Sequence, residues 1–471
     1  MRMTNQRLGS RSPAFAGSLH LGLRLVLGLG LLSAVAIGCG PAGRGGGDDG
    51  GDDTVGPDAT VVTTATVTGR VWAPNQAPGQ ASPGQEIPIS GALVYVVSER
   101  PAPIPATVYC EMCVATPQGG VLSAADGSFT LNVEPGNFWL VIQKGQFRIE
   151  QQIGLALGTT ALTPAQTTLP SQYKPEAGLF MPKVAVVEGT NDQIEDILGK
   201  IGFGTMAGTT FGNPNGENGA ELALYNYGTT GNTTATYLLS NIEEMRKYHI
   251  IFFPCATSMS SISTLLSDQT VLANIRRYVS EGGKLYVTDW SGELADRAFP
   301  QQVALGDTGA DSEGTYDPVT FTGTLTTTGD ADGGLYESPD GKAVDPDLNA
   351  WLGLQMGPQE NGSVGLYNPN AFEVTDNWNW IKKVNPVMLG TDDMGMPVYD
   401  TPKTWLTGSK PSEAGATNKP LAVTYQPTGC GKVLYTTFQT AVNGHVGLYP
   451  QERVLIYLIM EIQTCSDNPL F

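Results

Sequence analysis

The sequence is short of basic residues and of histidine. Its 471 residues include 26 lysines and arginines against 45 aspartates and glutamates, a formal net charge of −19, and only three histidines. Four of the arginines and none of the acids precede Cys39, so the chain that follows is more acidic still. A strongly acidic surface repels phosphate backbones and anionic lipid headgroups. Nucleic acid is therefore excluded as a partner, and membrane attachment through a basic patch is excluded as well.

The apolar run near the start is too short for a membrane span. It covers residues 25–38 and follows arginines without any intervening acid. A helix needs about 20 apolar residues to cross a bilayer. A positive segment, a short apolar run and small residues together are typical of a secretory signal peptide.

The residues Ala36-Ile37-Gly38-Cys39 resemble the lipobox of a bacterial lipoprotein precursor. The resemblance implies a signal peptide at 1–38, acylation of Cys39, export, and attachment to a cell-envelope membrane by lipid alone. Gly40 favours the outer membrane if the host has two membranes. Residues 39–59 are rich in Gly and Asp and predict a solvated tether. The alternative is an ordinary signal peptide cut elsewhere.

Five cysteines follow Cys39, and export predicts that most of them pair. For Cys110 and Cys113 a local disulfide is favoured, because no second CxxC or nearby histidine completes a zinc site. The last strand and the helix after it bring Cys430 and Cys465 to one sheet edge, which predicts a second bridge. Cys255 is then left as a buried thiol.

Residues 60–168 consist of short alternating runs separated by Gly, Pro and Asp, the pattern of antiparallel strands. The segments 68–71, 90–94, 126–129 and 136–140 together resemble the carboxypeptidase regulatory-like domain, a transthyretin-like β-sandwich of the carbohydrate-binding-like fold. The resemblance implies a module without a catalytic site, in a fold that includes sugar binders.

Two tryptophans are candidate ligand contacts in this region. If the apolar residues of their strands face inward, alternation turns Trp72 and Trp139 outward, where an indole stacks on a sugar ring. The alternative is that both pack against a second domain.

After a linker at 169–182, buried apolar strands alternate with amphipathic helices from 183 to 305. This predicts an α/β domain over 183–471 with a doubly wound, flavodoxin-like parallel sheet. A strand pair at 421–425 and 432–438 and a helix at about 451–462 complete it. The interval 306–400 is a turn-rich insertion.

The order of these elements resembles the class I glutamine amidotransferase-like fold, including its ThuA-like relatives. The family carries a nucleophilic cysteine on the turn after one strand, where this chain has Trp290. Gln439 and Ala441 stand where the family has His and Glu. The resemblance therefore implies that amidotransferase chemistry is lost, because these residues form no thiolate and imidazole pair.

Open α/β sheets bind ligands beyond the carboxyl ends of their strands. Five residues are expected to gather there: Cys255, Asp289, Ser291, Gln439 and His445. Cys255 with His445 is a candidate catalytic dyad if the two side chains touch. Ser291 is a second candidate nucleophile, although an N-cap of the following helix is favoured for it.

The insertion contains the segment 329–333, in which Asp330 and Asp332 are candidate calcium ligands. The further acids of an EF-hand do not follow, so a solvated turn is favoured, and we predict no cofactor. Trp351 and two further tryptophans suit a lid, a docking surface or core packing equally.

Two functions remain open. The first is a membrane-anchored, non-catalytic lipoprotein that binds glycan or cell-wall material, or that scaffolds proteins which the sequence does not name. The alternative is a hydrolase of the amidotransferase-like superfamily that uses Cys255 and His445 or the acidic crevice.

Overall fold

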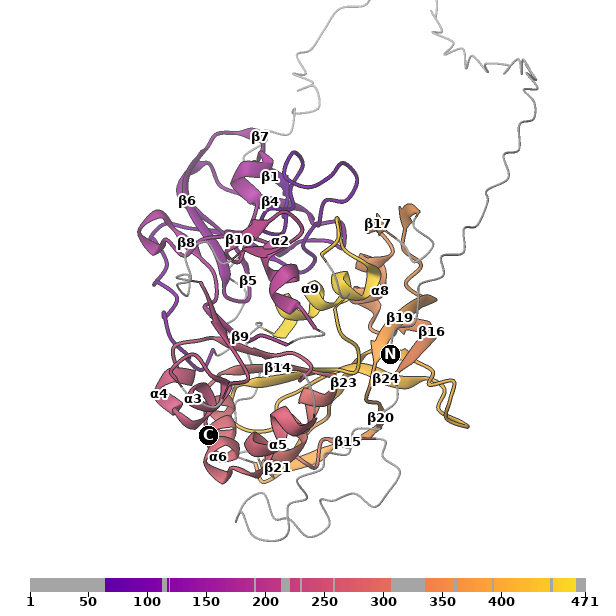
Figure 1. Ribbon diagram of the computed structural model, residues 1–471. Helices are drawn as coiled ribbons and strands as arrows, with labels where there is room; N and C mark the ends of the chain where they lie inside the picture. The colour runs from indigo at the N-terminus through magenta and orange to yellow at the C-terminus, as the bar shows by residue number, and fades with distance from the viewer. Residues whose placement is uncertain are drawn as a thin grey trace, which may run out of the picture. The chain divides into compact units, whose positions relative to one another are not determined.

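The computed structural model (Figure 1) contains two units, residues 1–60 and one compact unit of residues 61–471. The described residues are 64–111, 117, 119–189, 192–212, 221–228, 231–256, 259–305, 335–358, 363–391, 394–440 and 444–462. The signal peptide, the tether and several predicted site residues lie outside them, namely Cys39, Cys113, Asp330, Asp332, Ala441 and Cys465.

The first part of the compact unit forms two sheets. Their inward residues alternate along the strands, as at Phe129 and Leu131, and join one apolar core. The first sheet has the order β4 (Ser128–Val133), β1 (Ala65–Arg70) and β7 (Gly158–Ala161). The second has the order β3 (Val121–Leu122), β2 (Leu93–Val97), β5 (Gly136–Lys144), β6 (Phe147–Leu155) and β8 (Leu179–Phe180).

The main sheet has nine strands, and its first five are parallel. These five are β12 (Leu222–Tyr225), β9 (Val184–Val187), β13 (Ile250–Phe253), β14 (Lys284–Thr288) and β25 (Lys432–Thr436). Numbered along the chain, they run 2-1-3-4-5, so the order reverses between β9 and β13. Such a reversal opens a crevice at the carboxyl ends of the strands.

Helices cover both faces of the parallel strands, because alternate residues enter different cores: Val184 and Val186 on one face, Ala185 and Val187 on the other. The first face packs against α2 (Ile194–Lys200), α9 (Pro450–Ile462) and the N-terminal sheets. The other face packs against α3 (Ala235–Ser240), α4 (Ile242–Met245), α5 (Met259–Ser267), α6 (Gln269–Ser280) and α7 (Gly292–Ala298), drawn below the sheet in Figure 1.

The predicted insertion is part of the main sheet rather than an appendage. Beyond β25 the sheet continues through antiparallel strands, two of them from the insertion. They are β24 (Lys419–Tyr425), β23 (Lys403–Gly408), β16 (Tyr336–Ala343) and β19 (Phe372–Asn377). The insertion also contains the helix α8 (Pro346–Leu352), with the Asp345 carboxylate accepting from Leu348 N.

Short two-stranded ribbons complete the compact unit. They are β10 (Thr205–Ala207) with β11 (Thr210–Gly212), β15 (Val303–Leu305) with β20 (Ile381–Val384), β17 (Met356–Pro358) with β18 (Val364–Leu366), and β21 (Val387–Thr391) with β22 (Pro397–Asp400). The architecture is thus mixed and strand-rich, with several sheets.

The predicted disulfides are wrong. Cys110 bonds to Cys430, with Cα atoms 5.5 Å apart, which rules out both Cys110–Cys113 and Cys430–Cys465. The reason is that residues 105–111, here called the strap, leave the N-terminal sheets and cross the amino ends of the parallel strands. Val108 N donates to Arg246 O over 2.9 Å. Cys255 is a buried free thiol, as predicted.

The outward placement of Trp72 is also wrong. Its side chain is buried, and its backbone forms isolated β-bridges with Pro88 and Thr168. Trp139 is half-buried. Arginine guanidinium groups lie over both rings, Arg70 at 5.5 Å and Arg100 at 5.3 Å, so a face of each indole already carries a cation.

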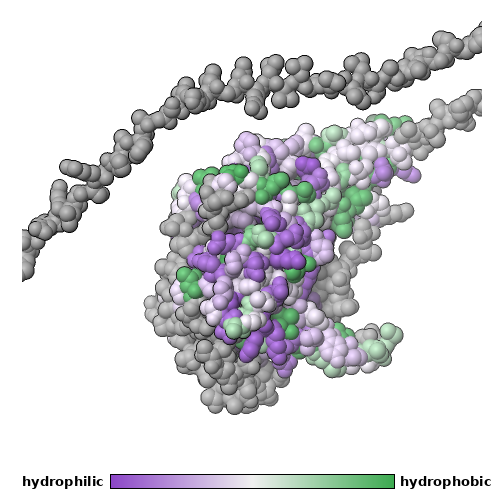
Figure 2. Space-filling view, turned by 90° about the vertical axis from the view of Figure 1, so that its right-hand side faces the viewer, coloured by the Kyte–Doolittle hydropathy of each residue, from purple (hydrophilic) through white to green (hydrophobic). Residues whose placement is uncertain are grey.

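The surface is mixed in polarity. On the face shown in Figure 2, hydrophobic residues lie scattered among hydrophilic ones. Among the helices of the described residues, none is both long and apolar enough to cross a membrane. The candidate lid tryptophan Trp351 is in the core, and its indole N–H donates to Pro88 O over 2.7 Å.

Candidate functional site

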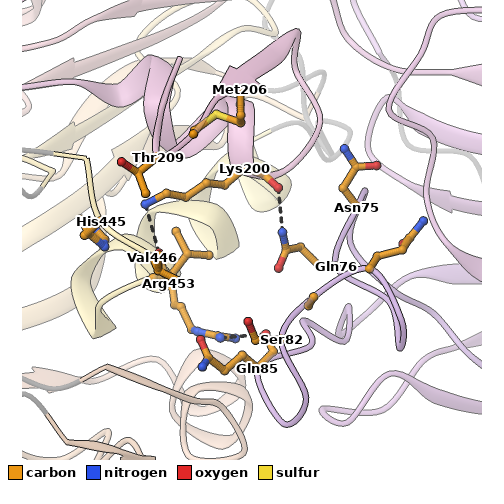
Figure 3. Close-up of a pocket in the computed structure, with 16 residues that line it drawn as sticks. Asn75, Gln76, Ser82, Gln85, Lys200, Met206, Thr209, His445, Val446 and Arg453 are labelled. Carbon is orange, nitrogen blue, oxygen red and sulfur yellow. Dashed lines mark hydrogen bonds between the residues drawn. The ribbon is translucent and has the colours of Figure 1, made fainter. Parts of the chain in front are cut away.

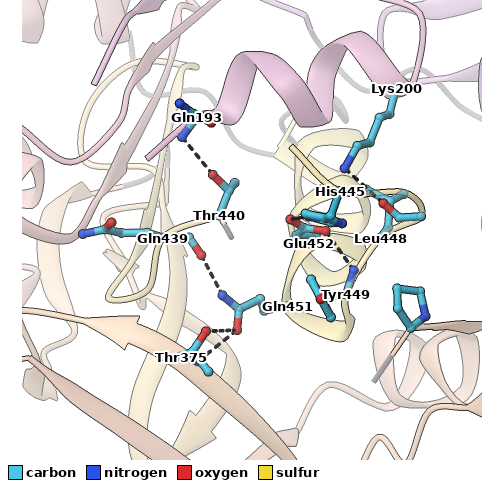
Figure 4. A network of polar contacts seen from close by, with 12 residues as sticks. Gln193, Lys200, Thr375, Gln439, Thr440, His445, Leu448, Tyr449, Gln451 and Glu452 are labelled. Atoms are coloured by element: carbon cyan, nitrogen blue, oxygen red, sulfur yellow. Dashed lines mark hydrogen bonds and ion pairs between the residues drawn. The ribbon is translucent and has the colours of Figure 1, made fainter. Parts of the chain in front are cut away.

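Two groups of polar residues lie near the carboxyl ends of the parallel strands. One is a buried network at the strand ends themselves, which contains most of the predicted site residues. The other is a cavity beside α2 and α9, which the sequence did not reveal. Figure 4 shows polar contacts of both regions, which meet α9 at Gln451 and Glu452.

Asp192 follows β9, at the point where the strand order reverses, and is completely buried. Its carboxylate accepts from Thr440 N over 3.0 Å and from Thr440 Oγ1 over 2.6 Å, and also from the Thr288 hydroxyl. Burial raises the pKa of this carboxyl, while the hydrogen bonds oppose that shift. Asp192 therefore connects the ends of three strands and serves as a structural anchor of this edge.

Asp289 is the most unusual residue of the network. It directly follows β14, has a φ of 49° and is fully buried. Gln439 Nε2 donates to its carboxylate over 2.6 Å and Trp378 N over 3.1 Å. Burial raises its pKa well above the ordinary value. A left-handed backbone is uncommon at a non-glycine residue, although Asp and Asn adopt it more readily than others, and such residues cluster at functional sites.

Cys255 follows β13 and contacts Asp289, but the environment suppresses its reactivity. Burial, and then the charge of Asp289, raises the pKa of the thiol. The thiolate is the nucleophilic form, so a raised pKa leaves the sulfur inert near neutral pH. The backbone N–H of Cys255 donates to Thr288 Oγ1 over 2.8 Å, which fixes the loop.

Ser291 and Trp290 complete the turn after β14. Ser291 stands at the N-cap of α7, but its hydroxyl does not cap the helix and instead donates to Pro254 O over 2.5 Å. Trp290 is half-buried and packs edge-on against Trp378, with ring centroids 5.4 Å apart. The strained backbone thus falls on Asp289, one residue before the position that the sequence assigned to the nucleophile.

Gln439 is buried and relays contacts toward α9. Its carbonyl accepts from Gln451 Nε2 over 2.8 Å, and Gln451 Oε1 in turn accepts from Thr375 N over 2.9 Å (Figure 4). This chain of neutral amides binds the last parallel strand to the insertion.

His445 does not join Cys255 in a dyad. Its Nε2 lies 2.8 Å from Glu452 Oε1 on α9, and its ring packs against Tyr449. The predicted Cys255 and His445 pair is therefore wrong: the histidine is committed to a carboxylate of the C-terminal helix, and the sulfur is committed to the network around Asp289.

The cavity beside α2 and α9 has a volume of about 330 Å³. We call it the polar pocket; 16 residues line it (Figure 3). They come from residues 75–85 of the N-terminal part, the end of α2, the β10–β11 ribbon, the segment 445–448 and α9. Its described lining contains three basic side chains, Lys200, His445 and Arg453, and no acid.

Contacts across the pocket hold the N-terminal part to the C-terminal part. Gln76 Nε2 donates to Lys200 O over 2.7 Å, and Arg453 donates to Gln85 O over 2.9 Å. Figure 3 shows Lys200 beside the 445–448 segment and the Arg453 guanidinium next to Gln85. Sequence reasoning missed the pocket because its walls come from three distant parts of the chain, residues 75–85, 199–209 and 445–453.

The candidate metal ligands Asp330 and Asp332 lie outside the described residues. Within the described part of the chain, no group of three or more His, Cys, Asp or Glu side chains is arranged to hold a metal ion.

No protein-family model matches the chain, and no curated protein matches it. Among solved structures it is similar to the cytoplasmic protein STM3548 from Salmonella typhimurium, at 14% identity and a TM-score of 0.25, covering 51% of this chain and 79% of that one. It is also similar to Gan42B, a GH42 β-galactosidase, at 12% identity and a TM-score of 0.24, over 60% of this chain and 30% of that enzyme. A catalytic mutant of Gan42B from G. stearothermophilus gives a TM-score of 0.20 at 14% identity, again over 60% of this chain and 30% of that one. Likenesses this distant carry no inference about fold or function.

Proposed function

We propose that this protein is a lipid-anchored binding protein of the cell envelope, in the outer membrane if the host has two membranes, and that it performs no amidotransferase reaction. The lipobox resemblance at Cys39 supports the anchor. The two N-terminal sheets support a carboxypeptidase regulatory-like module, and the strand order 2-1-3-4-5 supports an amidotransferase-like second domain.

One observation carries the binding role: the polar pocket opens where the two parts meet, whereas the strand-end residues are buried in a satisfied network. Its lining offers amides and hydroxyls at Gln76, Ser82, Gln85 and Thr209, groups that hydrogen-bond to sugar hydroxyls. Glycan or cell-wall material is therefore the proposed ligand class. We therefore propose this pocket as the ligand site in place of Trp72 and Trp139, because an arginine already lies over each of those rings.

The experiment uses residues 39–471 with Cys39→Ser, to keep the protein free of lipid, and cell-envelope polysaccharide immobilised on beads. We expect the beads to retain this protein. They should not retain Ser82→Trp, because Ser82 is an exposed residue of the pocket lining and an indole at this position would fill the pocket. Ser98→Trp is the matched control at an exposed position outside the pocket. Equal retention of both tryptophan variants would contradict the site. Palmitate labelling of the full precursor, abolished by Cys39→Ser, tests the anchor separately.

The strained Asp289 favours a second candidate, a hydrolase of the amidotransferase-like superfamily. A nucleophile elbow places its residue on a strained strand-to-helix turn, and Asp289 occupies such a turn beside Cys255. Turnover of an amide or ester by the wild type, lost in Asp289→Asn with thermal stability retained, would establish this function. Without turnover, the strain is a structural feature of the buried network.

A further inference from the structure

We infer that the polar pocket is an anion site, which takes its ligand through a carboxylate or phosphate group held between Lys200 and Arg453. The saccharide part of the ligand rests on the proposed function. The anionic part rests on the charges and hydrogen bonds of the pocket itself.

The composition of the lining is the first observation. The protein has 45 acidic residues, yet none is among the described residues that line the pocket, whereas three of its basic side chains are. An acidic chain repels anions at long range, so a cavity lined by Lys200 and Arg453 and by no described acid is a local exception to its field.

Arg453 is the second observation, because it is a buried cation whose hydrogen-bond partners are neutral. The side chain is 1% exposed. Its two terminal nitrogens donate to Gln355 Oε1 over 2.6 Å, to Gln85 O over 2.9 Å and to Met356 O over 2.8 Å. Its Nε is buried and has no acceptor among the described residues. A buried charge without a counter-ion is costly, and a bound anion offsets that cost.

Lys200 is the third observation. It is the last residue of α2, and its ammonium donates to Gly447 O over 3.0 Å. Two of its three N–H donors have no acceptor among the described residues and are left for a ligand. Burial lowers its pKa, so a negative ligand would stabilise its charged form.

Three acids act on these cations from outside the pocket lining: Asp196 on Lys200, Glu86 on Arg453, and Glu452 on both. Glu452 is already engaged. Glu452 Oε1 pairs with His445 Nε2 at 2.8 Å, and its other oxygen accepts from Tyr449 N over 2.8 Å. Within the described part of the chain, neither Lys200 nor Arg453 forms an ion pair with a carboxylate. The pocket therefore presents positive charge that the protein does not neutralise at contact distance.

The size of the pocket limits the ligand. A volume of about 330 Å³ lies at the lower end of the range of about 300–1,000 Å³ for small-molecule sites. It suits one acidic sugar residue, free or at the end of a chain, better than an extended polymer. The amides of Gln76 and Gln85 would then bind the hydroxyls while the cations bind the acidic group.

The test is calorimetric titration of residues 39–471 carrying Cys39→Ser with three probes: galacturonic acid, galactose and inorganic phosphate. We expect galacturonic acid to bind at least about tenfold more tightly than galactose, the worth of one charge-assisted hydrogen bond. Lys200→Gln should weaken galacturonic acid and phosphate by about tenfold and galactose by a smaller factor, because galactose offers the ammonium no negative charge. The matched control is Lys174→Gln, which removes an exposed lysine outside the pocket and should change nothing.

Each result separates the two proposals. Equal binding of galactose and galacturonic acid, both lost in Ser82→Trp, overturns the anion site and keeps the saccharide function. Binding of phosphate but of neither sugar keeps the anion site, and the polysaccharide retention experiment then decides the saccharide function. No binding of any probe overturns the anion site, and the polysaccharide retention experiment then decides the function alone. Lys200→Gln is the decisive variant because Lys200 is only half-buried, whereas replacing Arg453 endangers folding.

Discussion

Two basic side chains are buried at the amino end of the parallel sheet, together with Glu111 of the strap, and three carboxyl groups are buried at the carboxyl end. At the amino end, burial lowers the pKa of His249 to about 4 and that of Lys284 to about 8. At the carboxyl end, burial raises the pKa values of Asp192 and Asp289, and that of Glu195 to about 8. One end is closed by a strap fixed by a disulfide, the other by a hydrogen-bond network. The comparison teaches that closing either edge favours the neutral forms of the groups beneath, so the contributions of His249 and Glu195 to stability should change with pH in opposite directions.

The largest expected effect comes from releasing the strap. Cys110→Ser with Cys430→Ser opens a link between residues 320 positions apart, and for loops of that length the chain-entropy account gives a loss of roughly 5 kcal/mol. Denaturant unfolding of the variant should show this loss, and the wild type under reducing conditions should match the variant. Peptide mapping that finds Cys110 joined to Cys113 would contradict the link.

Removing a buried acid should have the next largest effect. With a folded pKa of about 8 and an unfolded value of about 4.3, Glu195 holds its proton more tightly in the folded state. The free energy of unfolding should therefore fall as the pH rises from about 4.3 to about 8, by a few kcal/mol in total. Glu195→Gln should be more stable than the wild type at pH 8.5 and nearly equal at pH 4.5.

The matched control is Glu134→Gln, which makes the same chemical change at an exposed position. Its unfolding midpoint should differ from the wild type by the same amount at pH 4.5 and pH 8.5. If Glu195→Gln behaves likewise, the carboxyl end does not hold a neutral acid.

His249 tests the amino end, where stability should be lost as the pH falls rather than as it rises. Its Nδ1 accepts from Lys183 N over 2.9 Å, and its Nε2 lies 3.0 Å from Pro105 O of the strap, so the neutral ring fits both contacts. A folded pKa of about 4 against about 6.5 unfolded means that stability is complete above pH 6.5 and is lost as pH falls toward 4, by about 3 kcal/mol.

His249→Gln keeps one acceptor and one donor without a titratable ring. It should therefore lose less stability than the wild type between pH 7 and pH 4.5. The direct measurement is the His249 pKa by NMR; a value near 6.5 would show that the strap does not bury the ring.

The sequence predicted the elements of this fold better than their contacts. Buried strands such as Ile250–Phe253 and the helix Pro450–Ile462 follow from local periodicity alone. The partner of Cys110 does not, because it depends on where the strap lies, which no local pattern encodes. The same holds for the candidate site. Cys255, Asp289 and Gln439 were placed together because parallel strands end at one edge, whereas the polar pocket needs residues 75–85 to meet α9.

Asp192 combines a predictable position with an unpredictable contact. It follows a recognisable strand, so its position at the edge was predictable, but its role was not. That role requires Thr288 and Thr440 to converge on it from strands far apart in the sequence. The predicted pairing of His445 was wrong although its sheet edge was right, because Glu452 in the first turn of α9 binds the ring instead.

The smallest expected effect sharpens the comparison at the carboxyl end, where Trp290 covers the network. Its indole N–H is buried without an acceptor among the described residues, and its ring packs edge-on against Trp378. Trp290→Phe keeps an aromatic contact and removes the unpaired donor, so the lost ring area and the relieved desolvation oppose each other, each worth about 1 kcal/mol. Denaturant unfolding should therefore show a change within about 1 kcal/mol of zero. Trp290→Ala, which leaves a cavity, should cost about 3 kcal/mol. If Trp290→Phe costs as much as Trp290→Ala, the indole N–H is bonded to a group in the part of the chain not described, and the network extends beyond the residues that define it here.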